Sequence, residues 1–364
     1  MNDPIVIVGA GLSGLRAATL LISQGYDCKV LEARARIGGR VLSNESLNRP
    51  DLGKFDLGPT WFWPKHEPVI SRLVKELGLQ TFVQHTEGAM LLEQFQNKSA
   101  QRYIVPEGSV ERSIRLSGGI KSLIDAVADT IPQGRIELDT RVTALRIKEN
   151  GTLIVEANHT SGKKENIRAR AVIFALPPRI VANHIKFSPK LSPKLFKSLN
   201  NKPTWMAGQA KVVTIYDHPF WRENGLSGQV TSRVGPLQEI HDASPETGCG
   251  ALFGFFGMHA KQRQKHDDKE VIKLVIEQLS RLFGSSANKP IDILYKDWSS
   301  DPETAVDDDL YPLLTYPNYG PPTGMSTWEK KIIFAGTETE SEYGGHLEGA
   351  LRSASRAVSE INEL

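Results

Sequence analysis

A glycine-rich turn near the N-terminus constrains the fold of this chain more than any other feature of its sequence. Residues 9–14 read Gly-Ala-Gly-Leu-Ser-Gly, and they follow an apolar, β-branched run at residues 5–8. Such a run is typical of a strand that is buried on both faces of a parallel sheet. Apolar side chains at helical spacing predict a helix over residues 15–23, and a second predicted strand, over 27–31, ends at Glu32.

This order of strand, turn, helix, strand and acidic residue predicts a binding site for a dinucleotide. Gly9 permits a tight turn, Gly11 lets the backbone approach a pyrophosphate, and Gly14 lets the helix lie close to the strand. The helix N-terminus offers free N–H groups and a partial positive charge to phosphate. The Glu32 carboxylate, about 20 residues beyond the turn, is placed to accept hydrogen bonds from a ribose. We therefore predict an α/β fold with a Rossmann-like, parallel-sheet nucleotide-binding domain.

Length and composition narrow the class of protein. The chain has 364 residues, 40% hydrophobic and 24% charged, so two or three folded domains are expected and a fibre or a wholly disordered chain is excluded. Lysine and arginine number 44 against 42 acidic residues, a balance too even to predict a nucleic-acid partner. The nine histidines show no metal-binding spacing such as H-E-x-x-H, so no metal site is expected.

The compartment is predicted from three features that the sequence lacks. Cys28 and Cys249 are the only cysteines, so no disulfide framework is expected and a reducing cytoplasm fits best. The first strand begins close to Met1, with no basic region or cleavage site of a signal peptide before it. No apolar run reaches the roughly 20 residues that cross a bilayer. We therefore expect a cytoplasmic protein that does not associate with membranes.

The stretch after the second strand resembles a known protein family. Residues 32–40 read Glu-Ala-Arg-Ala-Arg-Ile-Gly-Gly-Arg. They are similar to the E-A-x-x-x-x-G-G-R pattern of the FAD-binding amine oxidases, which include monoamine oxidases, polyamine oxidases, L-amino acid oxidases and flavin histone demethylases. The two glycines let backbone amides lie near a ligand, and Arg40 can pair with a phosphate or form a surface salt bridge. The resemblance implies that the dinucleotide is FAD.

A second matching stretch lies at residues 55–61. It resembles the family's D-x-G-x-x-W segment, which lies beside the isoalloxazine ring, and Gly58 in it permits close backbone approach. Two interpretations of the aromatic residues Trp61, Phe62 and Trp63 remain open. They line a substrate site, or they form part of the hydrophobic core.

Three further stretches match the family in its order along the chain. Residues 116–120 contain a Gly-Gly turn before a predicted helix, and residues 171–178 are a buried strand that ends in two prolines. A single strand is predicted over residues 136–147. In the family, the backbone at the position of Val142 contacts adenine.

The C-terminal match at residues 332–350 is long, and it leads into a predicted final helix. The resemblance implies that Glu338 binds near the pyrophosphate and ribityl groups, and that the helix N-terminus at His346–Leu347 faces the flavin N1–C2=O edge. A helix N-terminus stabilises the negative charge of a reduced flavin. Glu348 and Arg352 have the spacing of an ion pair on the exposed side of the helix.

The catalytic prediction centres on Lys211. It lies in a predicted strand over residues 210–216, followed by the corner Pro219-Phe220-Trp221, and the family has a strand lysine at this spacing that holds a water at flavin N5. Val213 and Ile215 are apolar on the same face, which favours an inward-pointing lysine whose pKa is lowered by desolvation. A strand-edge lysine that faces water is the alternative.

The resemblance implies oxidation of a small-molecule amine. A hydride passes from the carbon beside the amine nitrogen to flavin N5, the imine is hydrolysed, and O₂ reoxidises the flavin to give H₂O₂. Two alternatives share the nucleotide-binding motifs. One is a related FAD enzyme that acts on C–C bonds, such as a desaturase or a protoporphyrinogen-oxidase-like enzyme, although Lys211 with its Pro-Phe-Trp corner argues against it. The other is a non-catalytic FAD-binding protein.

The sequence departs from the family pattern at two places near the flavin. Residues 308–311 read Asp-Asp-Leu-Tyr where some relatives attach FAD to the cysteine of a G-G-C-Y segment, so FAD is expected to be non-covalent. Tyr311 would keep one wall of the family's aromatic cage. His346 stands where monoamine oxidases often have the other wall, a tyrosine. It would serve as a flat or hydrogen-bonding wall, or it would merely pack on the flavin at the helix start.

Members of the family usually have a helical subdomain of a hundred or so residues before the Gly-Gly turn. In this chain only residues 81–115 occupy that interval. The site is therefore expected to be more open, which would admit bulky amines but exclude water less well. The predicted FAD domain comprises residues 1–80, 116–180 and 298–364. A mixed α+β substrate domain, with strands over 210–216, 227–233 and 250–256 and a helix over 268–283, comprises residues 81–115 and 181–297.

The predicted site combines all of these stretches. The residues expected to act on the substrate are Lys211, Tyr311 and His346. The residues expected to contact FAD come from the glycine turns, the strand ends and the final helix, and they are Gly9, Gly11, Ser13, Gly14, Glu32, Ala33, Gly39, Arg40, Gly58, Pro59, Thr60, Trp61, Val142, Ala175, Trp298, Gly336, Glu338, His346 and Leu347. The sequence predicts neither the particular amine nor the oligomeric state.

Overall fold

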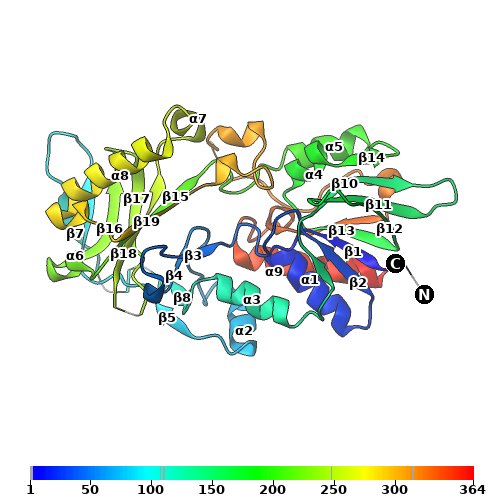
Figure 1. The fold of residues 1–364 in the computed structure, drawn as a ribbon, viewed down its shortest axis with the longest axis horizontal. Helices are drawn as coiled ribbons and strands as arrows, with labels where there is room; N and C mark the ends of the chain where they lie inside the picture. Colours follow the sequence, from blue (N-terminus) through cyan, green and yellow to red (C-terminus); the bar gives the residue numbers. More distant parts are fainter. Residues whose placement is uncertain (1–2, 107, 110, 247, 314) are drawn as a thin grey trace.

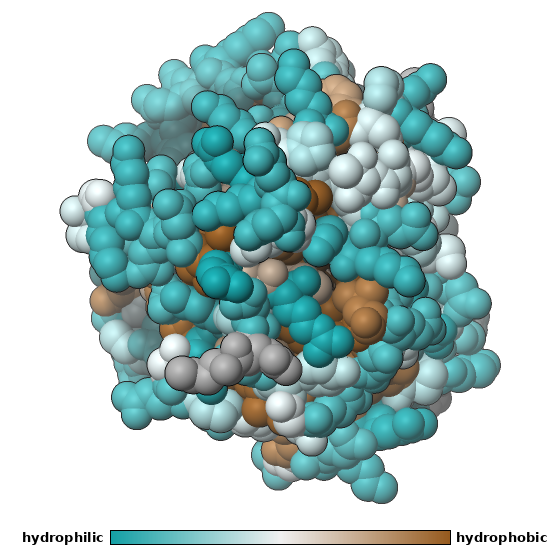
Figure 2. Space-filling view, turned by 90° about the vertical axis from the view of Figure 1, so that its right-hand side faces the viewer, coloured by the Kyte–Doolittle hydropathy of each residue, from teal (hydrophilic) through white to brown (hydrophobic). Residues whose placement is uncertain are grey.

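Two regions lie side by side along the longest axis of the molecule (Figure 1). A computed structural model describes residues 3–106, 108–109, 111–246, 248–313 and 315–364. One region contains a seven-stranded sheet, and the other contains a five-stranded parallel sheet. Both chain termini lie at the end of the molecule that holds the five-stranded sheet. Figure 2 shows this end of the molecule. Hydrophilic side chains cover most of it, and the hydrophobic patches between them are small.

The predicted Rossmann-like sheet is present. Its five parallel strands lie in the order β20 (Ile332–Phe334), β13 (Ala171–Phe174), β1 (Ile5–Val8), β2 (Cys28–Leu31) and β9 (Ile136–Glu137). All four residues of the central strand β1 are buried. This confirms a strand that is covered on both faces, as its continuous apolar sequence predicts.

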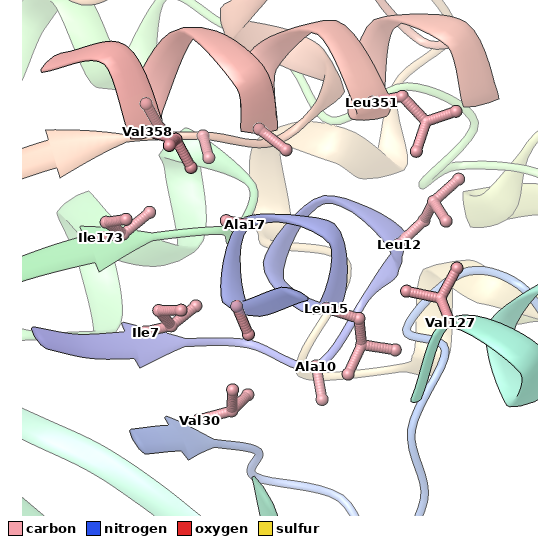
Figure 3. Close-up of a cluster of buried hydrophobic side chains, with 14 of the residues drawn as sticks. Ile7, Ala10, Leu12, Leu15, Ala17, Val30, Val127, Ile173, Leu351 and Val358 are labelled. Carbon is pink, nitrogen blue, oxygen red and sulfur yellow. The ribbon is translucent and has the colours of Figure 1, made fainter. Parts of the chain in front are cut away.

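Alternate residues of these strands face two different layers. Ile5 and Ile7 belong to a core cluster with the helices α1 (Leu12–Ser23), α2 (Pro68–Glu76), α3 (Lys121–Asp129) and α9 (Leu347–Asn362). Figure 3 shows Ile7 beside α1, with α9 packed above that helix. Val6 and Val8 belong to a second cluster with a smaller sheet and with α4 (Pro178–His184) and α5 (Pro193–Asn200). The period of two along a strand therefore divides the core into two layers.

The smaller sheet corrects one prediction. The strand predicted over residues 136–147 is two strands in different sheets, because Asp139 has a positive φ of 54° and turns the chain between them. The four strands of the smaller sheet lie in the order β12 (Lys164–Ala169), β11 (Leu153–His159), β10 (Thr140–Ile147) and β14 (Lys186–Ser188).

The seven-stranded sheet contains the predicted strands over 210–216, 227–233 and 250–256, the second of them one residue earlier. Its order is β19 (Asp292–Asp297), β15 (Ala210–Tyr216), β18 (Gly250–Phe256), β17 (Leu237–Asp242), β16 (Leu226–Ser232), β6 (Ala89–Glu93) and β7 (Gln101–Ile104). Helix α8 (Asp268–Phe283) covers one face, as predicted. On the other face Val213 and Ile215 pack against Phe55 and Leu57 of the nucleotide-binding region.

The remaining elements are short. They are β3 (Ser43–Glu45), β4 (Lys54–Asp56), β5 (Thr81–Val83), β8 (Ile114–Leu116), α6 (Phe220–Glu223), α7 (Ala260–Arg263) and, in the part of the chain that the structure describes, six 3₁₀ turns. Within the described residues of 81–115 all regular structure is strand, so the usual helical subdomain has no counterpart there. The domain boundaries stay a prediction; β14 and α5 lie beyond the predicted boundary at residue 180 but pack on the nucleotide side. Among the described residues, no helix combines the length and the apolar character that spanning a membrane requires.

Candidate active site

A cavity of about 390 Å³ lies where the two regions meet, and residues of both regions line it. Ligand pockets typically have volumes of roughly 300 to 1,000 Å³. Most predicted site residues line it, from both regions, and they are Gly9, Gly11, Ser13, Glu32, Gly39, Arg40, Gly58, Pro59, Thr60, Trp61, Ala175, Lys211, Trp298, Gly336, His346 and Leu347. Five predicted residues lie outside the lining, and they are Gly14, Ala33, Val142, Tyr311 and Glu338.

The glycine turns leave an open cradle at one end of the cavity. A Cβ placed on Gly11 would meet no protein atom within 4 Å, and a Cβ on Gly39 would lie 3.4 Å from the Cα of Gly11. Gly14 faces the strand instead, since its Cβ would lie 2.0 Å from the carbonyl oxygen of Gly9. A pyrophosphate can therefore approach the backbone at Gly11, and the residues present fit a dinucleotide such as FAD.

Glu32 lies at the same end and is held by the backbone. Its Oε2 accepts a hydrogen bond from Ala10 N–H (2.8 Å), and its Oε1 accepts one from Arg34 N–H (2.9 Å). Each carboxylate oxygen can accept a second bond, so the group can still bind a ribose. Val142, predicted to contact adenine, is buried in β10 and pairs with Ala157 of β11, outside the cavity lining.

Arg40 forms an ion pair with a buried partner, which corrects the alternative of a surface salt bridge. Its Nη1 and Nη2 donate to the two carboxylate oxygens of Glu338 at 2.6 and 2.9 Å. Glu338 is fully buried behind Arg40 and also accepts from Trp205 N–H (3.0 Å). Glu338 therefore orients Arg40 and Trp205, which line the cavity, and does not itself reach the ligand space.

Lys211 is buried at the cavity wall, with 1% of its surface exposed, which excludes a water-facing strand-edge lysine. Its Nζ donates to the Gly58 carbonyl (2.9 Å) and to the Thr60 hydroxyl, and it lies 4.0 Å from the centre of the Phe253 ring. Burial lowers the pKa of Lys211 to about 7, and the nearby Asp56 carboxylate only partly opposes this effect. A lysine in this state can exchange a proton near neutral pH.

The three aromatic residues after Gly58 divide between the two interpretations. Trp61 and Trp63 line the cavity, whereas Phe62 is buried in the core. Neighbouring rings form one wall. The Trp61 ring lies 5.4 Å from Phe253 and 6.4 Å from Trp63. Such rings offer an apolar surface to a ligand and attract a cation through their faces.

His346 and Glu67 form a pair that sequence reasoning missed. The His346 Nδ1 lies 2.9 Å from Glu67 Oε1, and the Glu67 Oε2 accepts from Trp63 N–H (2.8 Å). The two residues are N-caps of different helices, His346 of α9 and Glu67 of α2. The one available signal was an acidic residue directly before Pro68, at a predictable helix start. Nothing in the sequence connects that position to His346, 279 residues away.

Tyr311 does not form the second wall of a cage with His346. It is 58% exposed, and its hydroxyl bonds to the Lys261 amine instead. Trp205 lines the cavity near His346, since a Cβ on Gly345 would lie 2.7 Å from the Trp205 ring. The structure therefore places a tryptophan, from a segment that sequence reasoning did not single out, beside the start of the final helix.

Glu348 corrects a further prediction, because it is fully buried and not on the exposed side of the final helix. Its carboxylate accepts hydrogen bonds from Val69 N–H (3.0 Å) and Ile70 N–H (2.9 Å) at the start of α2, as well as from Arg352. The side chain therefore satisfies free N–H groups of a neighbouring helix. This contact holds the starts of α2 and α9 together, and with them Glu67 and His346.

Comparison with known families shows to which protein family the chain belongs. The model of flavin containing amine oxidoreductases matches residues 90–362, and that of NAD(P)-binding Rossmann-like domains matches residues 7–77. The chain belongs to the flavin-containing amine oxidoreductase family. Its cofactor is FAD, and it oxidises amines. The sequence-based prediction of family, fold, cofactor and reaction class is thereby confirmed.

This amine oxidoreductase is similar to curated proteins over nearly its whole length. Amine oxidase [flavin-containing] B of Sus scrofa is 24% identical over 467 aligned positions, which cover 98% of this chain and 85% of that protein. The corresponding protein of Homo sapiens is 25% identical with the same coverage. The alignments are about a hundred positions longer than the 364 residues present here. The relatives therefore have about a hundred residues without a counterpart in this chain, and their placement at the short interval 81–115 stays a prediction.

Solved structures share the fold. Putrescine oxidase bound to putrescine superposes with a TM-score of 0.81 at 20% identity, and the match covers 100% of both chains. Cyclohexylamine oxidase from Brevibacterium oxydans superposes with a TM-score of 0.79 at 20% identity, covering 100% of this chain and 99% of that chain. At this level of identity the two structures show that this amine oxidoreductase has the fold of those enzymes.

Proposed function

We propose that this protein oxidises a primary or secondary amine, passes the electrons to O₂ and releases an imine and H₂O₂. The observation that supports this most directly is the amine of Lys211, buried among aromatic rings at the wall of the cavity. Burying a lysine amine costs free energy, and a buried lysine with a strongly lowered pKa at a cavity wall is a candidate functional residue. The resemblance of residues 210–221 to the amine oxidases implies that this lysine lies beside the flavin.

The residues that would hold FAD lie along one side of the cavity. The open backbone at Gly11, next to Gly39, would receive the pyrophosphate, and Glu32 would bind a ribose. The N-terminus of α9 at Leu347 would stabilise negative charge at the flavin end. When bound, FAD supplies the two-electron chemistry by accepting a hydride from the carbon beside the amine nitrogen.

The chain's own residues would bind the amine, orient it and keep water away. Trp61, Trp63 and Phe253 form an apolar wall that suits a substituent without charge. Lys211 donates to the Gly58 carbonyl and to Thr60, so its amine is held in place at this wall. The names of similar proteins, which include a putative flavin-containing monoamine oxidase of Mycobacterium tuberculosis and a cyclohexylamine oxidase, support an amine of this kind.

We also propose that the protein acts in the cytoplasm, because its two cysteines predict no disulfide framework. We further propose that FAD is bound without a covalent bond. Both cysteines are buried, Cys28 in β2 and Cys249 before β18, and neither lines the cavity. A thiol–flavin bond needs a cysteine in contact with the ring. Denaturation is expected to release all of the flavin from the polypeptide. Flavin that stays with the denatured chain would contradict non-covalent binding.

The test of the proposed function compares wild type with Lys211→Met. H₂O₂ release is measured with primary and secondary amines of increasing apolar size, and flavin content is measured in parallel. Wild type is expected to release H₂O₂, and the variant is expected to retain FAD but to turn over about a hundredfold more slowly. The control is Lys186→Met, an exposed strand lysine outside the cavity. Equal turnover by Lys211→Met and the control would remove Lys211 from the reaction.

A further inference from the structure

An amine oxidase has to remove a proton before it removes a hydride. Alkyl ammonium ions have a pKa near 10, so at neutral pH only about one amine in a thousand is uncharged. The ammonium form has no lone pair on nitrogen to stabilise positive charge that develops on the neighbouring carbon. A site for amines therefore benefits from a group that takes up this proton, and the pair of Glu67 and His346 has the geometry for it.

Glu67 contacts the His346 ring through one of its two nitrogens, Nδ1. The Glu67 side chain is 3% exposed, and its two oxygens accept from the His346 Nδ1 and from Trp63 N–H. An ionised carboxylate only accepts hydrogen bonds, so Nδ1 must be the nitrogen that bears the hydrogen. In the neutral ring, Nε2 on the opposite edge is then an acceptor.

The Nε2 of His346 is available to accept a hydrogen bond from a ligand in the cavity. No residue in the described part of the chain forms a hydrogen bond with Nε2, and the ring lines the cavity. The backbone of His346 is fixed as well, because its carbonyl accepts from the Thr337 hydroxyl (2.8 Å) and from Ala350 N–H (3.2 Å). Ring and main chain are therefore both positioned before a substrate arrives.

One continuous wall joins His346 to the buried lysine. The His346 ring lies 5.9 Å from Trp63, Trp63 lies 6.4 Å from Trp61, and Trp61 lies 5.4 Å from Phe253, whose ring centre is 4.0 Å from the Lys211 amine. All five residues line the same cavity. The faces of these rings can hold an ammonium ion by cation–π attraction beside the histidine.

We propose that His346, held by Glu67, takes the proton from the ammonium nitrogen of the substrate. This inference rests on the proposed function and adds a residue to it. The N–H bond of the ammonium breaks, an Nε2–H bond forms, and the electron pair stays on the amine nitrogen. The positive charge moves to the imidazole, where the Glu67 carboxylate stabilises it. His346 is thus a catalytic residue and Glu67 a positioning residue.

The other charged residues of the lining already have partners. Glu32 accepts from two backbone N–H groups, Glu303 pairs with Arg141, Arg34 pairs with Asp301, and Arg40 pairs with Glu338. Glu348, on the same helix as His346, is turned to the start of α2.

Among the lining residues that the structure describes, the remaining competitor for the proton is Lys211, at the far end of the wall, because burial lowers the pKa of Lys211 to about 7. The experiment must therefore separate His346 from Lys211.

The test measures anaerobic flavin reduction by benzylamine at about pH 7.5 and about pH 10 in wild type and in His346→Phe, which keeps a flat wall but has no acceptor. If His346 accepts the proton, the variant can use only the free amine. Its second-order rate constant is then expected to be about a hundredfold below wild type at pH 7.5 and within about threefold at pH 10. Glu67→Gln is expected to show the same trend with a smaller loss.

A matched control comes from a second histidine–glutamate pair, in which His66 Nε2 lies 3.0 Å from Glu111 outside the cavity. Glu111→Gln should leave the rates unchanged at both pH values. A second readout does not depend on turnover. Nitrogen NMR of histidine-labelled, FAD-bound protein should show His346 protonated on Nδ1 in wild type and redistributed between the two nitrogens in Glu67→Gln.

Three results would overturn the inference. An equal loss at both pH values in His346→Phe would indicate a merely structural ring. A loss that fades at high pH in Lys211→Met, but not in His346→Phe, would assign the proton to Lys211. A His346 protonated on Nε2 in the wild type would contradict the hydrogen-bond assignment. Failure of the wild type to be reduced by any amine at either pH would instead refute the proposed function, and this inference with it.

Discussion

The variant Lys211→Met tests whether this lysine is buried. The quantity compared with wild type is the pH dependence of the unfolding free energy. Burial lowers the pKa of Lys211 to about 7 in the folded protein, whereas its ordinary value of 10.5 applies in the unfolded chain. Below pH 7 both states bind the proton, so folding includes the full cost of burying the charge. Above pH 10.5 neither state is charged and that cost is absent. The lysine therefore destabilises the fold at neutral pH, and this effect is lost as the pH rises.

The magnitude follows from the difference between the two pKa values. One pKa unit corresponds to about 1.4 kcal/mol, so the full cost is on the order of 5 kcal/mol. Between pH 7 and pH 10, roughly 3 to 4 kcal/mol of it disappears. Methionine fills a similar space without a proton to lose. The stability of Lys211→Met relative to wild type should therefore fall by roughly 3 to 4 kcal/mol over this range.

The assay is urea unfolding of both proteins at several pH values between 7 and 10. FAD is present at one fixed excess, so that binding of the cofactor contributes equally to the two proteins. Lys186→Met serves as the control, and its unfolding free energy should run parallel to that of wild type because Lys186 is exposed. If Lys211→Met also ran parallel to wild type, the reasoning that this lysine is buried with a pKa lowered to about 7 would be refuted.

Three further predictions concern the cofactor and the helix contact. Gly11→Val places a side chain in the open cradle, so the purified variant should lack FAD, and a normal ratio of flavin absorbance to protein would contradict the cradle. Glu32→Ala should raise the Kd for FAD about tenfold in a fluorescence titration, since it removes a charged hydrogen-bond acceptor; an unchanged Kd would exclude the ribose contact. Glu348→Ala leaves the N–H groups of Val69 and Ile70 without their partner and should lower the unfolding free energy by about 2 to 4 kcal/mol in urea, whereas a loss below about 0.5 kcal/mol would contradict that role.

Local patterns were enough to predict the nucleotide-binding fold. The run at residues 5–8, the glycine turn and Glu32 lie within about 30 residues, and their roles depend on backbone conformation and on the period of two along a strand. The burial of Lys211 was predictable for a similar reason, because Val213 and Ile215 share its face. Both predictions rest on neighbours in the sequence, for which spacing determines direction.

Contacts between distant residues were not predictable in this way. The pairs of Arg40 with Glu338 and of Glu67 with His346 join residues 298 and 279 positions apart. Each pair depends on how helices and sheets pack, which hydrophobic periodicity does not specify. Glu348 shows the same limit, because i,i+4 spacing predicts an ion pair on a helix but not which side of the helix another element covers.

The central claim is that an amine reduces the flavin bound in this cavity, and anaerobic bleaching of the flavin absorbance tests it most directly. The panel contains benzylamine and cyclohexylamine as apolar monoamines, putrescine as a diamine and phenylalanine as an amino acid. We predict bleaching by the apolar monoamines, because the wall at Trp61 and Trp63 is apolar and the charged lining residues already have partners. FAD verified as bound but not bleached by any member of the panel would contradict the claim.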